Sequence, residues 1–240
     1  MIRFQSWAAS HPGAVRTHNE DSFVDRPDLG LWAVADGAGG HDSGEVASGM
    51  LKAALEAIPG GLSAAELLAQ VRLRVASVHE ALRAEASRRG PRAIIASTLV
   101  VLLARDGHFA CLWAGDSRIY LLRRGELVQV TRDHSLVQEL VDAGTITAEE
   151  AEGHPRANVI TRAVGATEEL ELDKVSNRLA PGDRFLLCSD GLNKTLSDAE
   201  LAALLAPPEP PADRLIAEAL ARTASDNITV VAVDTLLERT

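Results

Sequence analysis

Residues 97–131 read STLVVLLARDGHFACLWAGDSRIYLLRRGELVQVT. Runs of Val, Leu, Ile and aromatic residues in this stretch predict strands at 97–104, 109–115, 118–124 and 126–131. The triplet Arg105-Asp106-Gly107 and the pair Arg124-Gly125 have the residue types of tight turns. Because such turns join neighbouring strands into hairpins, the stretch predicts antiparallel sheets.

The same residue types predict further strands at 31–36, 184–190 and 227–236. Helices are expected at 43–58 and 212–223, and also after Ser63, Thr147 and Ser197, each of which is followed three residues later by Glu, as in a capping box. Helices and strands do not alternate regularly, unlike those of a parallel doubly wound sheet. The expected fold class is therefore α+β, with residues 1–240 forming a single domain.

The composition limits the partners and the setting. The chain has 240 residues and a net charge of -10, which disfavours nucleic acid and anionic lipid as partners. No run approaches the roughly 20 apolar residues that span a membrane. Cys111 and Cys188 lie inside apolar runs, as buried thiols in a reducing compartment do. We expect a cytoplasmic monomer that binds neither membrane nor nucleic acid, although no feature of the sequence decides the oligomeric state.

Four aspartates stand at the ends or starts of predicted strands, within Ala35-Asp36-Gly37, Gly115-Asp116-Ser117-Arg118, Ser189-Asp190-Gly191 and Ser225-Asp226-Asn227. Any one of them alone could be an ordinary turn residue. Carboxylates that come close together repel and raise one another's pKa, so a cluster of them requires hard cations such as Mg²⁺ or Mn²⁺. The spacing along the chain does not show whether they converge.

Other catalytic motifs are absent from the sequence or incomplete. The glycine-rich stretch 37–42 follows a predicted strand, but Asp42 stands where a dinucleotide-binding loop has its third glycine. The chain has no Gly-Lys-Ser/Thr phosphate loop, no Gly-x-Ser-x-Gly around a serine and no His-Glu-x-x-His or paired cysteines for zinc.

Five short motifs follow one another along nearly the whole chain. They are Gly13-Ala-Val-Arg16-Thr-His-Asn19-Glu20-Asp21-Ser22, Ala35-Asp36-Gly37-Ala-Gly39-Gly40-His41, Gly115-Asp116-Ser117-Arg118, Ser189-Asp190-Gly191-Leu192 and Asp226-Asn227-Ile228-Thr229. Each is weak alone, but five in this order with these separations form a strong signal. In these motifs the chain resembles the metal-dependent protein phosphatases of the protein phosphatase 2C type, in their compact bacterial form.

The resemblance implies a four-layer α-β-β-α sandwich with two central antiparallel sheets and metal ions at one edge. It implies two Mn²⁺ or Mg²⁺ ions in the core of the site. Asp36 would bridge them, the carbonyl of Gly37 would bind the first, and Asp190 and Asp226 would bind the second. Asp116 with Asp190 would bind a third, weaker ion.

The resemblance also implies catalytic and substrate-binding roles. Glu20 and Asp21 would hold metal-bound water, and Arg16 would bind the substrate phosphate, which matches its planar guanidinium. Animal relatives place a His directly after the Asp-Gly pair, where this chain has Ala38. His41 is the nearest substitute for binding substrate or donating a proton, and it could equally be structural.

By the same resemblance, one segment bears on specificity and one short stretch departs from the family's pattern. Residues 132–165 correspond to a mobile flap-like segment, to which we assign substrate selection. Asn193-Lys194 stand where a bulkier residue is frequent, so the local surface is expected to differ.

The function implied is that of a protein serine/threonine phosphatase, which hydrolyses phosphoserine and phosphothreonine by direct attack of metal-activated water. Its expected partners are phosphoproteins, either substrates of a eukaryotic-like serine/threonine kinase or that kinase itself. An alternative is a catalytically weak regulatory or partner-binding module of the same fold, which typically loses metal ligands. A third interpretation is a hydrolase of small phosphate esters, which requires a closed pocket.

Overall fold

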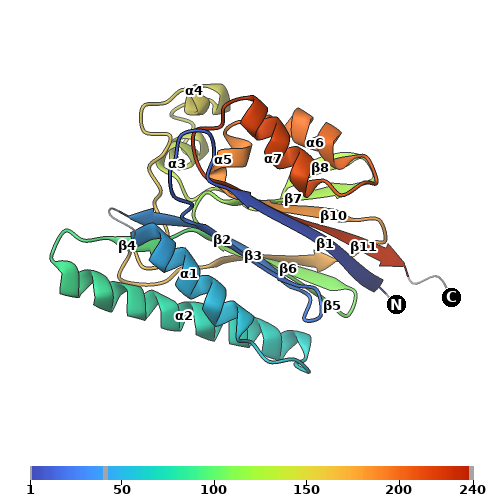
Figure 1. The fold of residues 1–240 in the computed structure, drawn as a ribbon, viewed down its shortest axis with the longest axis horizontal. Coiled ribbons are helices and arrows are strands. Elements are labelled where there is room, and N and C mark those ends of the chain that lie inside the picture. The colour runs from blue at the N-terminus through green and yellow to red at the C-terminus, as the bar shows by residue number, and fades with distance from the viewer. Residues whose placement is uncertain (1, 40–42, 238–240) are drawn as a thin grey trace.

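The computed structural model describes residues 2–39 and 43–237, in which two antiparallel β-sheets pack face to face (Figure 1). The first sheet has the order β1-β11-β10-β7-β8. Its strands are β1 Ile2–His11, β11 Ile228–Leu237, β10 Arg184–Cys188, β7 Arg118–Arg123 and β8 Glu126–Gln129. The second has the order β2-β3-β5-β6-β9, and β4 pairs with β3. Its strands are β2 Asp21–Arg26, β3 Leu31–Gly39, β4 Ile95–Ser97, β5 Leu99–Arg105, β6 His108–Ala114 and β9 Asp173–Arg178.

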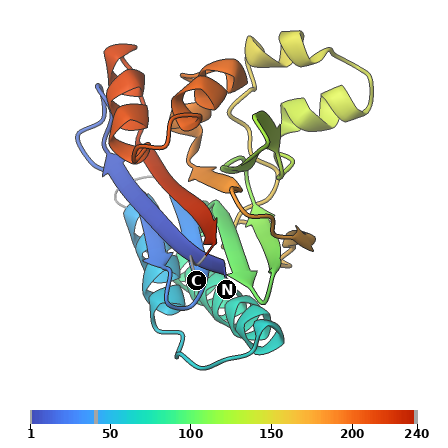
Figure 2. The same ribbon diagram turned by 90° about the vertical axis from the view of Figure 1, so that its right-hand side faces the viewer.

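Helices cover the outer faces of both sheets. The second sheet is covered by α1 Ser43–Glu56 and α2 Ala64–Arg89, and the first by α5 Asp190–Asn193, α6 Asp198–Leu205 and α7 Ala212–Ala221 (Figures 1 and 2). The two short helices α3 Leu136–Asp142 and α4 Ala148–Glu152 project from the sandwich on the side of α5 (Figure 1). The α-β-β-α sandwich predicted for this chain is therefore confirmed.

Alternation along the strands decides which side chains enter each layer. In β3, Leu31, Ala33 and Ala35 pack toward α1 and α2, whereas Trp32 and Val34 pack between the sheets. Successive side chains of a strand point to opposite faces. Asp36, the next residue, therefore shares the inter-sheet face with Trp32 and Val34, at the point where the two sheets meet.

The predicted turns form two hairpins. Asp106 and Gly107 have φ values of 51° and 74°, and Arg124 and Gly125 have 55° and 84°. Positive φ at both central residues matches the twist of antiparallel strands, as in a type I′ turn. The hairpins belong to different sheets, because β5 pairs with β6 and β7 with β8. The chain crosses between the sheets after β6, and this crossing carries Asp116.

The helix expected after Ser63 and the proline-rich loop are also found. Ser63 caps α2 through a capping box with Glu66, and the buried stripe of α2 contains Leu67, Val71, Val75, Val78 and Leu82. The loop 207–211 separates α6 from α7. No helix within 2–39 and 43–237 is both long and apolar enough to cross a membrane.

Candidate active site

Asp21 and Asp36 are directly opposite each other in the β2–β3 ladder. Both side chains therefore lie on the same face of the second sheet, the face that packs against the first sheet. Two like charges in this arrangement destabilise a sheet unless something compensates them.

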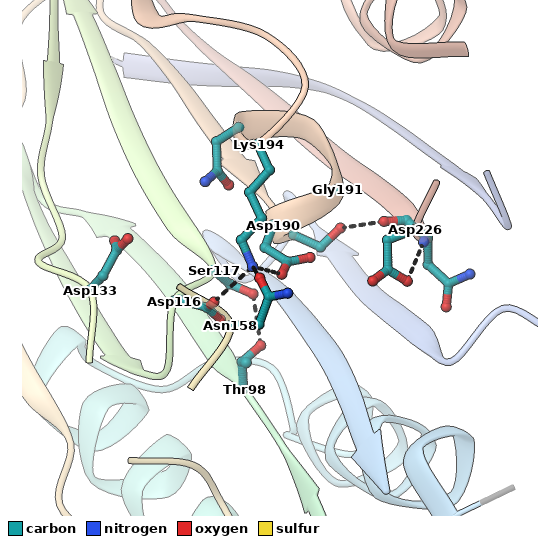
Figure 3. Close-up of polar contacts among 12 residues, drawn as sticks. Thr98, Asp116, Ser117, Asp133, Asn158, Asp190, Gly191, Lys194 and Asp226 are labelled. Carbon is teal, nitrogen blue, oxygen red and sulfur yellow. Dashed lines mark hydrogen bonds and ion pairs between the residues drawn. The ribbon is translucent and has the colours of Figure 1, made fainter. Parts of the chain in front are cut away.

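The other three carboxylates come from segments that end at the same edge. Asp116 lies in the crossing after β6, Asp190 begins α5 directly after β10, and Asp226 lies just before β11. Figure 3 shows Asp190 between Asp116 and Asp226, and the charges of all three act on Asp36, although long stretches of sequence separate them. The four aspartates that the sequence placed at strand ends therefore converge, together with Asp21.

Gly191 allows this convergence. A Cβ at this residue would lie 2.0 Å from the carbonyl oxygen of Asn227. Because only glycine permits so close an approach, α5 can rest on the start of β11. This contact holds Asp190 next to Asp226, since each is one residue away from the contacting pair.

Burial and mutual repulsion raise the pKa of several of these carboxyls. Burial raises the pKa of Asp21 to about 7, with contributions from Asp190 and Asp226. Burial, then repulsion from Asp190, raises the pKa of Asp116 to about 6. Burial raises the pKa of Asp36 well above its ordinary value. The negative charges of four carboxylates raise it further, namely those of Asp21, Asp190, Asp116 and Asp226. Part of the Asp36 surface remains accessible, so the group can still meet an ion from solvent.

Two buried carboxylate oxygens lack any hydrogen-bond donor. They are Oδ1 of Asp21 and Oδ1 of Asp116, for which the described residues offer no partner. Buried polar atoms are nearly always satisfied, and a charged one without a partner costs more than a neutral one. These oxygens therefore point to a positively charged group that belongs at this edge.

Arg16 supplies one positive charge from the chain itself. Its Nε and Nη2 atoms each lie 3.0 Å from one of the two carboxylate oxygens of Asp226. Hydrogen bonding to Asp226 raises the pKa of Arg16. The guanidinium is 57% exposed and Asp226 is 44% exposed, so this is a surface ion pair of modest strength from which Arg16 can turn toward a ligand.

Lys194 supplies a second positive charge. Its Nζ lies 2.5 Å from Oδ2 of Asp190 and 3.5 Å from Oδ2 of Asp116 (Figure 3). Burial acts to lower the pKa of Lys194, but attraction to Asp190 and Asp116 outweighs it, and the pKa is raised. The sequence had indicated only a changed surface at this residue. Its spacing of four from Asp190 on one helical turn is the signal that could have revealed the ion pair.

Neutral side chains hold the carboxylates in place. Ser189 donates its hydroxyl to Oδ2 of Asp21 at 2.7 Å. The backbone N–H of Asp36 donates to the hydroxyl of Thr98 at 3.1 Å, and Thr98 shares a hydrogen bond of 2.7 Å with Ser117 (Figure 3). The sequence did not single out these hydroxyls, because their partners lie far away along the chain.

Glu20 and Gly37 lie together at the end of the β2–β3 ladder. The N–H of Gly37 donates to the carbonyl of Glu20 at 3.2 Å, and the N–H of Glu20 donates to Oδ1 of Asn227 at 2.8 Å. A Cβ at Gly37 would lie 2.1 Å from the carbonyl oxygen of Gly44. His41, expected to bind substrate, lies outside the described residues.

The donor set fits hard divalent cations. It offers carboxylate and carbonyl oxygens without sulfur, which is the preference of Mg²⁺ and Mn²⁺. In the part of the chain that the structure describes, no three His, Cys, Asp or Glu side chains close around a single point. Part of the cause is local, because the carboxylates of Asp190 and Asp226 are turned toward Lys194 and Arg16.

The segment 132–165, predicted to resemble a flap, reaches this edge through His134 and Asn158. The N–H of His134 donates to the carbonyl of Gly115, next to Asp116, at 2.9 Å. Asn158 accepts a hydrogen bond of 2.9 Å from Nζ of Lys194 (Figure 3). The base of the segment is fixed by Arg118, which forms a bidentate ion pair with the two oxygens of Asp133. The segment is therefore held to Lys194 by Asn158 and to β7 by Asp133, while α3 and α4 lie outside the sandwich (Figure 1).

Comparison with known proteins places this architecture in a family. The family profile described as Protein phosphatase 2C matches residues 13–228. The serine/threonine protein phosphatase PstP of Mycobacterium tuberculosis is 41% identical over 229 residues, which are 95% of this chain and 44% of PstP. This chain thus spans less than half the length of that relative. The chain belongs to the protein phosphatase 2C family, as its motifs predicted.

Solved structures agree over almost the full length. PppA, described as a key regulatory component of T6SS in Pseudomonas aeruginosa, is 45% identical with a TM-score of 0.89, and the match covers 98% of each chain. The catalytic domain of PstP in complex with two manganese ions is 39% identical with a TM-score of 0.85, covering 99% of this chain and 100% of that one.

Proposed function

We propose that this chain is a metal-dependent protein serine/threonine phosphatase that hydrolyses phosphoserine and phosphothreonine. The observation that carries the proposal is the convergence of Asp21, Asp36, Asp116, Asp190 and Asp226 at one edge of the two sheets, with Arg16 beside them. Family membership and the manganese-bound relative support it.

Metal binding is assigned to the oxygen donors at this edge. Asp36, the carbonyl of Gly37, Asp190 and Asp226 would hold two Mn²⁺ or Mg²⁺ ions. Such ions, when bound, supply positive charge that neutralises the carboxylates and lowers the pKa of a water that attacks phosphorus. The third, weaker ion that the resemblance implies at Asp116 and Asp190 would have to displace Lys194 from both carboxylates.

The chain's own residues position the substrate and the water. Arg16 can leave Asp226 and present two N–H donors to a phosphate, a geometry that lysine cannot reproduce. One carboxylate oxygen of Asp21 accepts a hydrogen bond from the hydroxyl of Ser189. The other oxygen can accept a hydrogen bond from a water molecule and so orient that water. Glu20 is assigned the same role at the neighbouring position. His41 as a ligand for substrate, or as the proton donor to the leaving alkoxide, stays a prediction.

The partners follow from the substrate class. We propose phosphorylated serine/threonine proteins as substrates, including a eukaryotic-like kinase or its targets, and a chain that acts in the cytoplasm as a monomer and a single domain. The flap-like segment is proposed to select among substrates. A regulatory module of the same fold remains the alternative, and the retention of Asp36, Asp190 and Asp226 favours the enzyme.

The test is phosphate release from a phosphothreonine peptide by the purified protein. Release that requires millimolar Mn²⁺ and stops with EDTA is expected. Bound Mn²⁺ without turnover would support the regulatory module instead. A preference for a small aryl phosphate over every phosphopeptide would indicate a hydrolase of small esters.

A further inference from the structure

Lys194 is fixed over the carboxylate cluster by its place in the chain. It follows the single helical turn of α5, and its backbone N–H donates to the carbonyl of Asp190 at 2.9 Å. This i, i+4 spacing places the side chain above Asp190. The ammonium then contacts three oxygens, at 2.5 Å from Asp190, 2.9 Å from Asn158 and 3.5 Å from Asp116 (Figure 3).

These contacts define a specific position for the ammonium group of Lys194. Asp116 is only 4% exposed, so its charge is poorly hydrated, and Lys194 is its only cationic contact among the described residues. An ammonium has three donors, and the three oxygens provide an acceptor for each. The ammonium of Lys194 is therefore matched by oxygens at this position, and Oδ1 of Asp116 is the one buried carboxylate oxygen there that has no partner among the described residues.

The same two carboxylates, Asp116 and Asp190, are those expected to bind the third ion. An ion there would meet Lys194 at a distance of a few ångströms, and two positive charges cannot share two monovalent carboxylates without strong repulsion. Lys194 and the third ion are therefore alternatives at this position. Of the carboxylates assigned to the two core ions, Asp36 and Asp226 have no contact with Lys194, and only Asp190 is shared with it.

We propose that Lys194 takes the place of the third metal ion, so that this protein works with two bound ions and an ammonium where a third would lie. The inference rests on the proposed function, because it assumes that the core carboxylates bind metal. The ammonium also links the flap-like segment to α5, because it donates a hydrogen bond to Asn158. A metal ion held only by the carboxylates of Asp116 and Asp190 would not make this hydrogen bond.

The experiment counts bound Mn²⁺ by equilibrium dialysis and isothermal titration calorimetry. It compares the wild-type chain with Lys194→Met, which keeps the length of the side chain and removes its charge, and with Lys194→Arg, which keeps the charge. The control is Lys174→Met, which removes one positive charge from the exposed strand β9. Circular dichroism verifies folding, and Lys194→Gln replaces the Met variant if that variant does not fold.

The proposal predicts two Mn²⁺ per chain for the wild type, Lys194→Arg and Lys174→Met. It predicts a further Mn²⁺ in Lys194→Met, bound at least about tenfold more tightly than any further ion in the wild type. Equal numbers and affinities in the wild type and Lys194→Met, with Mn²⁺-dependent turnover intact, would overturn the inference alone. No Mn²⁺ in any of the chains would overturn the inference and the proposed function together.

Discussion

Asp21 and Asp36 face each other across the β2–β3 ladder, and both have a raised pKa. Buried carboxylates in register would be a defect in an ordinary sheet, because each loses hydration and repels the other. A fold can tolerate such a pair where a bound cation neutralises its charge. The pair therefore links the strand register directly to the need for metal, and several predictions depend on it.

The first prediction concerns pH in the metal-free protein. A carboxyl whose pKa is higher in the folded than in the unfolded chain binds its proton more tightly when folded. Its contribution to stability is present below the unfolded pKa of about 3.9, and it is lost as pH rises through the folded pKa. That folded pKa is about 6 for Asp116 and about 7 for Asp21. In EDTA, the free energy of unfolding should fall between pH 5 and 8 by an amount on the order of a few kcal/mol.

Thermal unfolding across this pH range checks the prediction. The variant Asp21→Asn should show a shallower decline in EDTA, because it removes one of the titrating groups. Saturating Mn²⁺ should remove the decline in the wild type, since the ions bind the deprotonated carboxylates. A melting temperature in EDTA that rises steadily from pH 5 to 8 would contradict this account of the cluster.

A second prediction concerns Gly191. An alanine there would place its Cβ 2.0 Å from the carbonyl oxygen of Asn227, which forces α5 away from β11 and separates Asp190 from Asp226. Gly191→Ala should therefore weaken Mn²⁺ binding by at least about tenfold and destabilise the fold by about 1–3 kcal/mol. Calorimetric titration and chemical unfolding measure both effects.

Gly49 provides the matched control, because a Cβ there meets nothing within 4 Å and the residue lies inside α1. Gly49→Ala should leave Mn²⁺ affinity unchanged and stabilise the helix by about 0.5–1 kcal/mol. If both alanine variants bind Mn²⁺ like the wild type, the close approach of α5 to β11 is not what positions the ligands.

A third prediction separates phosphate binding by Arg16 from its ion pair with Asp226. Arg16→Lys should raise KM for a phosphothreonine peptide by about tenfold or more, because the bidentate geometry is lost. It should change the free energy of unfolding by less than about 1 kcal/mol, since the pair is exposed. Steady-state kinetics and denaturant unfolding check the two parts. Unchanged KM with reduced stability would show that the role of Arg16 is structural.

Much of the fold could be predicted because its signals are local. Two turns with positive φ and the capping boxes at Ser63, Thr147 and Ser197 lie within a few residues of sequence, and the structure places hairpins and helices there. The strands β1, β2 and β9 were not predicted. All residues of β9 are exposed, and β1 is only partly buried, so neither shows strict apolar alternation.

The convergence of the aspartates could not be derived from spacing, because it depends on strand pairings between distant segments. Asp226 reaches the cluster through the β10–β11 pairing, and Asp21 through the register with Asp36. The resemblance to a family supplied the roles of Arg16 and the metal ligands, and those roles stay predictions. Lys194 was noted only as a departure; its spacing from Asp190 is a local signal, whereas its contacts with Asn158 and Asp116 depend on segments whose positions no local rule gives.

The most direct test of the central claim is the turnover of Asp36→Asn on a phosphothreonine peptide with saturating Mn²⁺. Asn keeps the shape of the side chain and removes the charge at the centre of the cluster. The account predicts a loss of turnover of at least about a thousandfold, in a protein that melts in EDTA at a temperature no lower than the wild type. Near-normal turnover by this folded variant would contradict the assignment of the cluster as a two-metal hydrolytic site.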